Sequence, residues 1–136
     1  MKIIFYGGAG SVTGSNYMIE SGGTKILVDC GLMQGSRFVE KENFEPFAYN
    51  PADVSAVFVT HAHVDHTGKL PKLVKDGFKG KIYSTPPTRD FAELLLIDSV
   101  HVLMEEVNRQ GLAPIYEAED IESAMKMWDG VPYRES

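Results

Sequence analysis

The sequence predicts an α/β fold, because short strand-like runs are followed along the chain by stretches with helical periodicity. Short runs of apolar and β-branched residues, bounded by glycine, proline or polar turns, are typical of strands. These runs are Lys2–Tyr6, Asn16–Glu20, Lys25–Asp29, Ala56–Thr60 and Lys81–Ser84. Helical stretches are expected near Gly68–Gly77, Pro87–Gln110 and Ala118–Trp128. The sequence contains no repeat or internal domain boundary, so residues 1–136 are expected to form one unit.

The glycines of the N-terminal segment are expected to mark turns between strands. The run Lys2–Tyr6 is expected to be a short buried strand that ends at two glycines. The segment Ser21–Thr24 contains a Gly-Gly pair and is typical of a hairpin turn. The glycines at positions 8, 10 and 14 superficially resemble a dinucleotide-binding loop, but a strand follows where that loop would open a helix. The sequence therefore gives no support for nucleotide binding here.

The helices are predicted from proline, glycine and apolar spacing. Pro71 is tolerated in a helix only in its first turn, so this helix should begin near Gly68 and stop at Gly77. The long helix should end at Gly111. Its apolar face consists of positions three and four residues apart: Leu96, Val100, Leu103 and Val107. The apolar face of the last helix consists of Ile121, Met125 and Trp128.

The composition is that of an ordinary soluble chain with an acidic balance. Of 136 residues, 43% are hydrophobic and 24% are charged, which suits a globular core. No signal peptide or apolar stretch of ~20 residues is present, so a cytoplasmic location without membrane contact is expected. The net charge of −6 has the wrong sign for a surface that grips nucleic acid as a whole. The single Cys30 is expected to be a small buried residue; a metal ligand is the alternative.

The most informative feature is residues 61–66, His-Ala-His-Val-Asp-His, directly after the predicted strand Ala56–Thr60. Neutral imidazole and carboxylate bind zinc and related divalent ions well, and so tight a cluster is costly unless something holds it together. The alternative is that these are solvated loop histidines or the remnant of an affinity tag. A tag would be a plain histidine run at a terminus, whereas this cluster lies within the chain and contains an aspartate. The run therefore predicts a metal site.

The spacing of these residues favours two metal ions over one. Side chains alternate along an extended chain, so His61, His63 and Asp65 would project to one side. His66 must point elsewhere. If the chain turns into a helix there, His61 and His63 can hold one ion, while Asp65 and His66 hold a second at roughly 3.5–4 Å. All four residues are therefore predicted metal ligands.

Several segments of the chain resemble one family of proteins. The run Thr60–Gly68 resembles the HxHxDH signature of the metallo-β-lactamase superfamily. The opening Phe5–Ser15 and the segment Ile26–Gly31 are similar to the start of its β-CASP branch, and so is Thr88–Asp90 leading into Leu94–His101. That branch contains RNA-cleaving enzymes, including the RNase J group and the endonuclease subunit of the polyadenylation machinery. The resemblance covers essentially the whole chain.

The resemblance implies a fold, and it also implies how much of the family's catalytic domain residues 1–136 cover. The fold is the N-terminal αβ half of a four-layer αβ/βα metallo-β-lactamase sandwich. Family members continue with a further histidine ligand in a Gly-His-x-x-Gly-Ser context, a bridging aspartate, the inserted β-CASP domain and a late histidine. No histidine follows His101 in this sequence. Residues 1–136 are therefore expected to be a partial domain that lacks the β-CASP insert and the C-terminal half.

The resemblance also implies zinc-dependent hydrolysis of RNA phosphodiester bonds by the full-length parent, with single-stranded RNA as its partner. His61 and His63 would bind the first of two zinc ions, and Asp65 and His66 the second. Asp65 is the predicted catalytic residue, since its carboxylate would lie nearest the reacting water and could orient it or take its proton. Asp29 is expected to lie under the site and to orient the ligand loop by hydrogen bonds. A surface turn aspartate is the alternative.

Two other functions stay open for the chain. It lacks the remaining ligands, so it is expected to be an inactive or incomplete fragment with partial zinc occupancy. One alternative is another hydrolase of the same fold that acts on a thioester or a lactam, against which the opening Val12–Ser15 argues. The other is a non-catalytic metal-binding or interaction module. His101 is far in sequence from the ligands and is expected to have a structural or interfacial role; a substrate-facing role is the alternative.

The implied half-sandwich would leave the outer face of its sheet uncovered. That face would include side chains from Ile3–Phe5, Ile26–Val28 and Val57–Val59. Contiguous exposed apolar patches larger than a few hundred Å² are rare on soluble monomers. Self-association is therefore expected, with two such sheets stacked face to face in a two-fold dimer.

Overall fold

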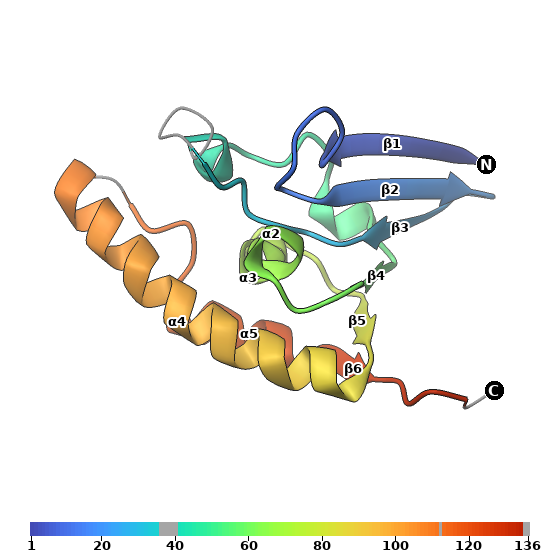
Figure 1. The fold of residues 1–136 in the computed structure, drawn as a ribbon. Coiled ribbons are helices and arrows are strands. Elements are labelled where there is room, and N and C mark those ends of the chain that lie inside the picture. Colours follow the sequence, from blue (N-terminus) through green and yellow to red (C-terminus); the bar gives the residue numbers. More distant parts are fainter. Residues whose placement is uncertain (36–40, 112, 135–136) are drawn as a thin grey trace.

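The computed structural model describes the backbone of residues 1–35, 41–111 and 113–134, and the side chains of all of these except 103–110. Leu103 and Val107, two predicted positions on the apolar face of the long helix, therefore lie outside the described side chains. The described chain forms a β-sheet with helices packed against it, as Figure 1 shows. The predicted α/β class is confirmed.

Six strands of the described residues form one sheet in the order β1-β2-β3-β4-β5-β6. The antiparallel part consists of β1 (Lys2–Gly7), β2 (Asn16–Ser21) and β3 (Thr24–Val28). The parallel part continues from β3 through β4 (Ala56–Phe58), β5 (Lys81–Ser84) and β6 (Trp128–Gly130). Because parallel strands end at the same edge of a sheet, the residues that follow β3 and β4 lie close together. This edge carries the candidate site.

The predicted hairpin between β2 and β3 is confirmed. Ser21 pairs with Thr24, and the two intervening residues, Gly22 and Gly23, have φ angles of +56° and +83°. A two-residue turn with positive φ at both central positions matches the right-handed twist of the strands, and glycine adopts it at little cost. A strand, not a helix, thus follows the N-terminal glycines, in agreement with the rejection of a nucleotide-binding loop.

The helices cover one face of the sheet. Within the described residues they are α2 (Val64–Thr67), α3 (Leu70–Lys75), α4 (Pro86–Gln110), α5 (Ala118–Lys126) and the 3₁₀ helices η1 (Lys41–Phe44) and η2 (Pro51–Asp53). Leu27, Val57 and Ile82 of the central strands are fully buried, and they share one core with Leu73 of α3 and Leu96 of α4. No described helix is long and apolar enough to cross a membrane.

Helix α3 and the long helix α4 have the ends that the sequence predicts. Pro71 lies in the first turn of α3, and Gly77 follows that helix with a φ of +113°. Helix α4 ends directly before Gly111, whose φ is +66°. Both glycines adopt the left-handed region that commonly terminates a helix. Proline and glycine therefore set these boundaries.

The helical segment after the histidines begins earlier than the helix predicted near Gly68. The chain becomes helical at Val64 rather than near Gly68, because the short helix α2 precedes α3. The hydroxyl of Thr67 donates to the carbonyl oxygens of Ala62 and His63, at 3.2 and 3.0 Å. These bonds stabilise the single turn of α2. The end of the histidine run is thus helical and not extended.

The prediction that Lys2–Tyr6 forms a buried strand is wrong. Strand β1 lies at the edge of the sheet, and Ile3 and Phe5 are 51% and 61% exposed. Ile4 on the opposite face packs against the core. An unbroken apolar run is typical of a strand covered on both faces, but here the described helices cover one face only.

Trp128 was expected to end the last helix and instead begins strand β6. Helix α5 stops at Lys126, and the backbone N–H of Met127 bonds to the carbonyl of Ala124. The indole Nε1 of Trp128 donates to the Ser84 hydroxyl at 2.9 Å, which fixes β6 beside β5. A strand of only three residues leaves no periodic signal, so the apolar spacing pointed to a longer helix.

The outer face of the sheet is apolar and partly exposed. Strand register brings Phe5, Tyr17, Val28, Phe58 and Tyr83 into one row across five strands. Phe58 is 45% exposed and stacks on Tyr83, with ring centroids 5.4 Å apart. Phe5 meets Tyr17 edge to face at the same centroid distance. The outer face thus carries a row of aromatic side chains opposite the helices.

Candidate metal centre

Three backbone hydrogen bonds hold the histidine-bearing segment against the ends of β2 and β3. The N–H of Ser15 donates to the carbonyl of Asp65 at 2.8 Å, and the N–H of Cys30 donates to the carbonyl of His66 at 2.8 Å. Leu32 makes the same kind of bond to Val64 at 2.9 Å. Two strand ends far away in sequence therefore fix the position of α2.

Gly31 allows this close approach. A Cβ atom at this position would lie 1.7 Å from the carbonyl oxygen of Asp65 and 2.7 Å from the backbone nitrogen of His66. Real Cβ atoms do not come so close to backbone atoms, so any side chain here would push the α2 segment away. The requirement for glycine is steric, since Gly31 does not have a positive φ.

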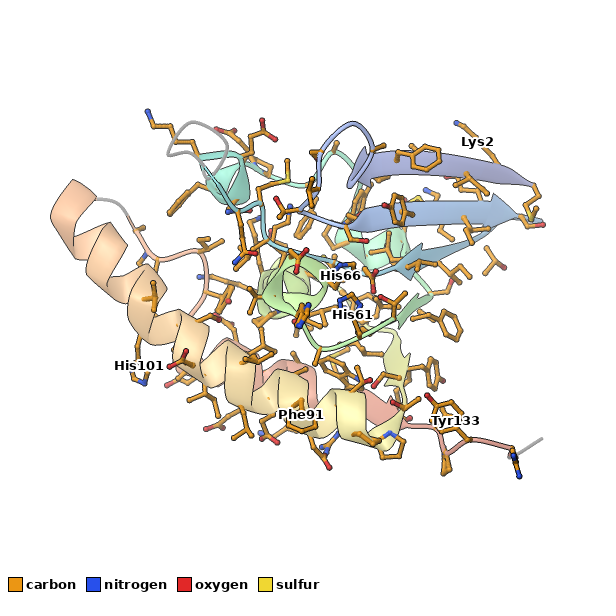
Figure 2. The ribbon with its side chains drawn as sticks, viewed as in Figure 1. Lys2, His61, His66, Phe91, His101 and Tyr133 are labelled. Atoms are coloured by element: carbon orange, nitrogen blue, oxygen red, sulfur yellow. The ribbon has the colours of Figure 1, made fainter. Side chains whose placement is uncertain are left out.

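The structure brings the four predicted ligands together. The rings of His61 and His63 have centroids 4.8 Å apart, and those of His61 and His66 are 3.9 Å apart. His66 Nε2 lies 3.4 Å from a carboxylate oxygen of Asp65. Figure 2 shows His61 and His66 side by side at the end of the sheet. Asp65 reaches the cluster from α2, not from an extended chain as expected.

A buried carboxylate lies under the cluster. Asp29 is 1% exposed, which excludes the alternative of a surface turn residue. Its carboxylate accepts hydrogen bonds from the Ser15 hydroxyl at 2.9 Å and the Thr60 backbone N–H at 2.8 Å. His66 Nδ1 lies 2.8 Å from the same carboxylate. Because an ionised carboxylate only accepts, this nitrogen carries a proton, so Nε2 is the nitrogen of His66 that can serve as a metal ligand.

Asp29 has a φ of +61°, which is uncommon for a residue with a side chain. Such a conformation costs free energy and persists where surrounding contacts over-determine it. Here these contacts include the hydrogen bonds of the carboxylate and the bond from the Asp29 N–H to the Phe58 carbonyl at 2.9 Å. Sequence reasoning found Asp29 but missed Ser15 and Thr60. The position of Thr60 directly before the histidine run was the available signal.

The environment favours the neutral form of the His61 imidazole. Burial is the largest cause that lowers its pKa, and repulsion from His66 and His63 lowers it further. The carboxylates of Asp29 and Asp65 act in the opposite direction but do not reverse the shift. Neutral imidazole is the form that binds a metal ion, so the shift favours ligation at neutral pH.

The spacing of Asp65 and His66 fits two ligands on one metal ion. Two atoms bound to one tetrahedral zinc ion at ~2.0–2.2 Å lie roughly 3.3–3.6 Å apart. The 3.4 Å between His66 Nε2 and the Asp65 carboxylate falls in this range. Within the described residues, however, no three or more His, Cys, Asp and Glu side chains form a group that could hold a metal ion. The described chain thus offers partial ligand sets.

Two other candidate functional residues, Cys30 and His101, lie away from the histidine cluster. Cys30 is fully buried and accepts a hydrogen bond from Asn16 Nδ2 at 3.4 Å, which confirms the expected buried residue. Burial raises the pKa of its thiol to about 11, so the thiolate needed for metal binding is disfavoured. His101 lies on the exposed side of α4, separate from His61 and His66 (Figure 2).

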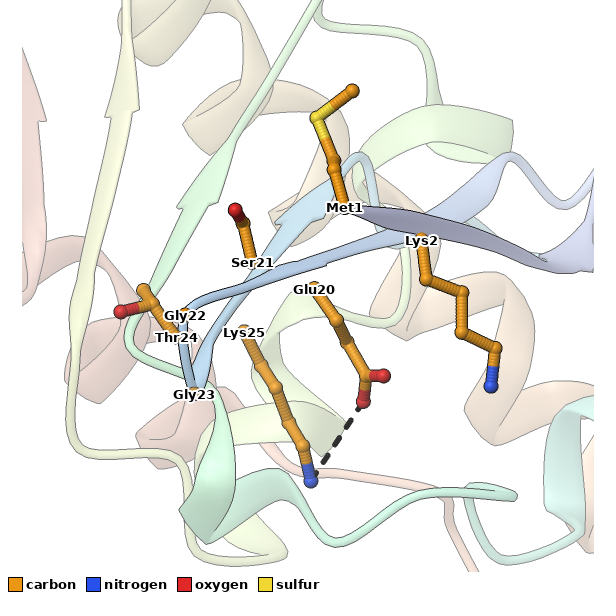
Figure 3. Close-up of a pocket in the computed structure, with 8 residues that line it drawn as sticks. All are labelled: Met1, Lys2, Glu20, Ser21, Gly22, Gly23, Thr24 and Lys25. Atoms are coloured by element: carbon orange, nitrogen blue, oxygen red, sulfur yellow. Dashed lines mark ion pairs between the residues drawn. The ribbon is translucent and has the colours of Figure 1, made fainter.

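A pocket of about 340 Å³ lies at the hairpin (Figure 3). It is lined by Met1, Lys2 and residues 20–25, and none of the predicted site residues takes part. The lining residue Lys25 is already ion-paired, since its Nζ lies 4.0 Å from Glu20 and 3.0 Å from Asp53. The histidine cluster therefore remains the candidate functional site.

The fold and the histidine cluster define a candidate metal-binding α/β protein, and comparisons with known proteins identify its family. The model of the metallo-beta-lactamase superfamily matches residues 9–122. This chain belongs to that superfamily. It is 40% identical over 125 residues to ribonuclease TTHA0252 of Thermus thermophilus, with 92% of this chain and 27% of that protein covered.

Further relatives carry a different name. Transcription termination factor FttA of Methanosarcina mazei is 39% identical over 111 residues, with 78% of this chain and 17% of that protein covered. Among solved structures, BJP-1, a subclass B3 metallo-beta-lactamase of Bradyrhizobium japonicum, aligns with 60% of this chain and 30% of its own. That alignment has a TM-score of 0.44 and 26% identity.

The comparisons confirm the resemblance found in the sequence. Both the superfamily and the relation to ribonuclease-type members, matched over a part of their length, are as expected. The fold class, an α/β structure that corresponds to the N-terminal αβ half of the metallo-β-lactamase sandwich, is confirmed as well. The chain spans 27% of the first relative and 17% of the second.

The substitution Gly31→Ala should destabilise the protein by about 3 kcal/mol or more, because its Cβ would displace the backbone of α2. Gly22→Ala is the matched control: it lies at φ +56° in open space and should cost only about 1 kcal/mol. Urea unfolding of the two variants gives both values. Equal losses would mean that the approach of Gly31 to Asp65 does not constrain the fold.

Proposed function

We propose that this chain is the N-terminal portion of a β-CASP-type zinc-dependent metallohydrolase that cleaves RNA phosphodiester bonds in the full-length protein. The main support is the histidine cluster, in which Asp29 binds Nδ1 of His66 and leaves Nε2 available as a ligand. The relatives named as a ribonuclease and as transcription termination factors support RNA as the substrate. Single-stranded RNA and a cytoplasmic location belong to the same proposal.

Two zinc ions are proposed for the complete enzyme. His61 and His63 would hold the first, and Asp65 and His66 the second. Zinc supplies an activated water near neutral pH and offsets negative charge on the phosphoryl oxygens. Asp65 would orient the reacting water or take its proton, and Asp29 would hold the His66 ring in place.

The described chain supplies two predicted ligands for each ion, whereas catalytic zinc sites use three protein ligands and structural sites four. The remaining ligands would come from further parts of the protein. We therefore propose that residues 1–136 are a partial domain and that the β-CASP insert and the C-terminal half belong to the rest of the protein. On its own, the chain would be an inactive or incomplete fragment.

Two other functions are less well supported. A hydrolase of this superfamily that acts on a thioester or a lactam would use the same histidine run. The names of the relatives favour RNA over either substrate. A non-catalytic metal-binding or interaction module would also keep the histidine run, but the first relative is named as a ribonuclease, which favours a hydrolase.

Self-association through the outer face of the sheet is part of the proposal. Phe5 and Phe58 are 61% and 45% exposed on that face. Each Å² of apolar surface removed from water contributes ~25 cal/mol, and a stable interface needs about 1,000 Å² or more. The net charge of −6 opposes association only weakly, since salt screens charges beyond about 8 Å at physiological ionic strength.

The isolated chain should retain fewer than two zinc ions after dialysis against a low chelator concentration, because each ligand set is partial. Asp29→Asn should weaken zinc binding about 10- to 100-fold, since His66 would lose its carboxylate partner. Asparagine tolerates the positive φ at this position, so the backbone should stay unchanged. Asp53→Asn, at an exposed ion pair with Lys25, is the control. Two tightly held ions per wild-type chain would contradict the partial site.

The full-length protein should cleave labelled single-stranded RNA in the presence of zinc or manganese, and His63→Ala should reduce the rate by about 100-fold or more. His101→Ala should leave the rate unchanged, since His101 lies apart on α4. The isolated chain should give no cleavage above its own His63→Ala variant. If the full-length protein hydrolyses a thioester or a lactam but not RNA, the substrate assignment is wrong.

At micromolar concentration the wild-type chain should sediment as a dimer, and Phe58→Ser should shift it towards monomer by removing an exposed aromatic side chain from the outer face. Leu94→Ser is the matched control, because Leu94 is 66% exposed on α4 and lies off the sheet. Analytical ultracentrifugation distinguishes the species. A folded wild-type monomer would show that the uncovered sheet does not drive association.

A further inference from the structure

We propose that Thr60 is a positioning residue that fixes the tautomer of His61 by linking it to the Asp29 carboxylate. The inference rests on the proposed role of His61 as a metal ligand. Thr60 Oγ1 lies 3.0 and 2.9 Å from the two carboxylate oxygens of Asp29, and 3.0 Å from His61 Nδ1. The Thr60 hydroxyl is thus within hydrogen-bond distance of both the Asp29 carboxylate and the His61 ring.

The direction of these hydrogen bonds follows from the number of protons available. The Thr60 hydroxyl has one proton, and the ionised Asp29 carboxylate can only accept. If the proton pointed to His61, lone pairs of Thr60 would face two carboxylate oxygens at 2.9 and 3.0 Å, which is repulsive. A hydrogen bond to a carboxylate is also roughly twice as strong as one between neutral groups. The Thr60 hydroxyl therefore donates to Asp29.

The lone pairs of Thr60 Oγ1 are then left for the imidazoles. His66 Nδ1 is 3.4 Å from Thr60 Oγ1 but only 2.8 Å from Asp29, so its proton goes to the carboxylate. His61 Nδ1 is 3.0 Å from the same oxygen and donates its proton to it. His61 thereby keeps the proton on Nδ1 and leaves Nε2 free to bind metal. Asp29 therefore fixes the proton position on His66 directly, and that on His61 through the Thr60 hydroxyl.

The backbone of Thr60 is held independently of its hydroxyl. Its N–H donates to Asp29 at 2.8 Å, and this bond survives replacement of the side chain. Without the hydroxyl, the buried Asp29 carboxylate keeps its bonds to the Ser15 hydroxyl, the Thr60 N–H and His66 Nδ1. Thr60→Val keeps the β-branched shape and deletes the hydrogen bonds of the hydroxyl to Asp29 and His61. Thr60→Ser keeps the link.

The test is the tautomer of His61 in the metal-free chain, measured by long-range ¹H–¹⁵N NMR at about pH 8, where an imidazole with an ordinary pKa near 6.5 is neutral. The wild type and Thr60→Ser should show the proton on Nδ1 of His61. Thr60→Val should shift His61 towards the mixture of a solvated imidazole. His66 should not change, because Asp29 holds it directly. An unchanged His61 in Thr60→Val, or a wild type with its proton on Nε2, overturns the proposal.

Zinc binding gives a second readout. Thr60→Val should weaken zinc affinity about tenfold, as is typical when a residue that hydrogen-bonds to a metal ligand is replaced. Thr60→Ser should keep the zinc affinity of the wild type. If the wild-type chain binds no zinc, the proposed metal role fails while the NMR result still decides the role of Thr60. If the His61 tautomer shifts but zinc affinity stays constant, Thr60 does not act on metal binding and the positioning role is wrong.

Discussion

The carboxylate of Asp29 is the interaction on which the site depends. A buried negative charge is costly unless hydrogen bonds satisfy it. The donors come from three separate segments, with Ser15 before β2, Thr60 after β4 and His66 in α2. Moving any one of these segments would leave the charge partly unsatisfied. The same carboxylate that positions the imidazoles therefore also joins the strand ends, and this explains why the φ of +61° at Asp29 is tolerated.

The electrostatics of the cluster point to a cation. Three imidazoles lie within 5 Å of a neighbouring ring, and two carboxylates contact His66. The lowered pKa of His61 shows that the carboxylates do not compensate for burial and for repulsion between the rings. The neutral form of His61 is therefore favoured, and the carboxylates of Asp29 and Asp65 are the acidic groups of the cluster. A divalent ion can neutralise both carboxylates while using lone pairs that the tautomers leave free.

The sequence predicted features that follow from local rules. Strand β5 and helix α4 have the expected bounds within one residue, since proline and glycine terminate them. The histidine run was recognised because its chemistry is unusual for a structural loop. The partner Ser15 was missed because it is distant in sequence from the histidine run, and Thr60 was missed although it directly precedes that run. Trp128 was misassigned because pairing with a distant strand, not local periodicity, decides the state of a three-residue segment.

The partial ligand sets and the uncovered sheet face are connected through strand β4. Phe58 carries an exposed aromatic ring on the outer face, and its carbonyl oxygen accepts the N–H of Asp29 at 2.9 Å. Thr60 follows two residues later and begins the ligand segment. Any layer that packs on the outer face near Phe58 therefore also reaches the edge where the histidines lie. In the proposed full-length enzyme, one packing event would cover apolar surface and bring the remaining ligands to the site, so that metal binding and completion of the fold stabilise each other.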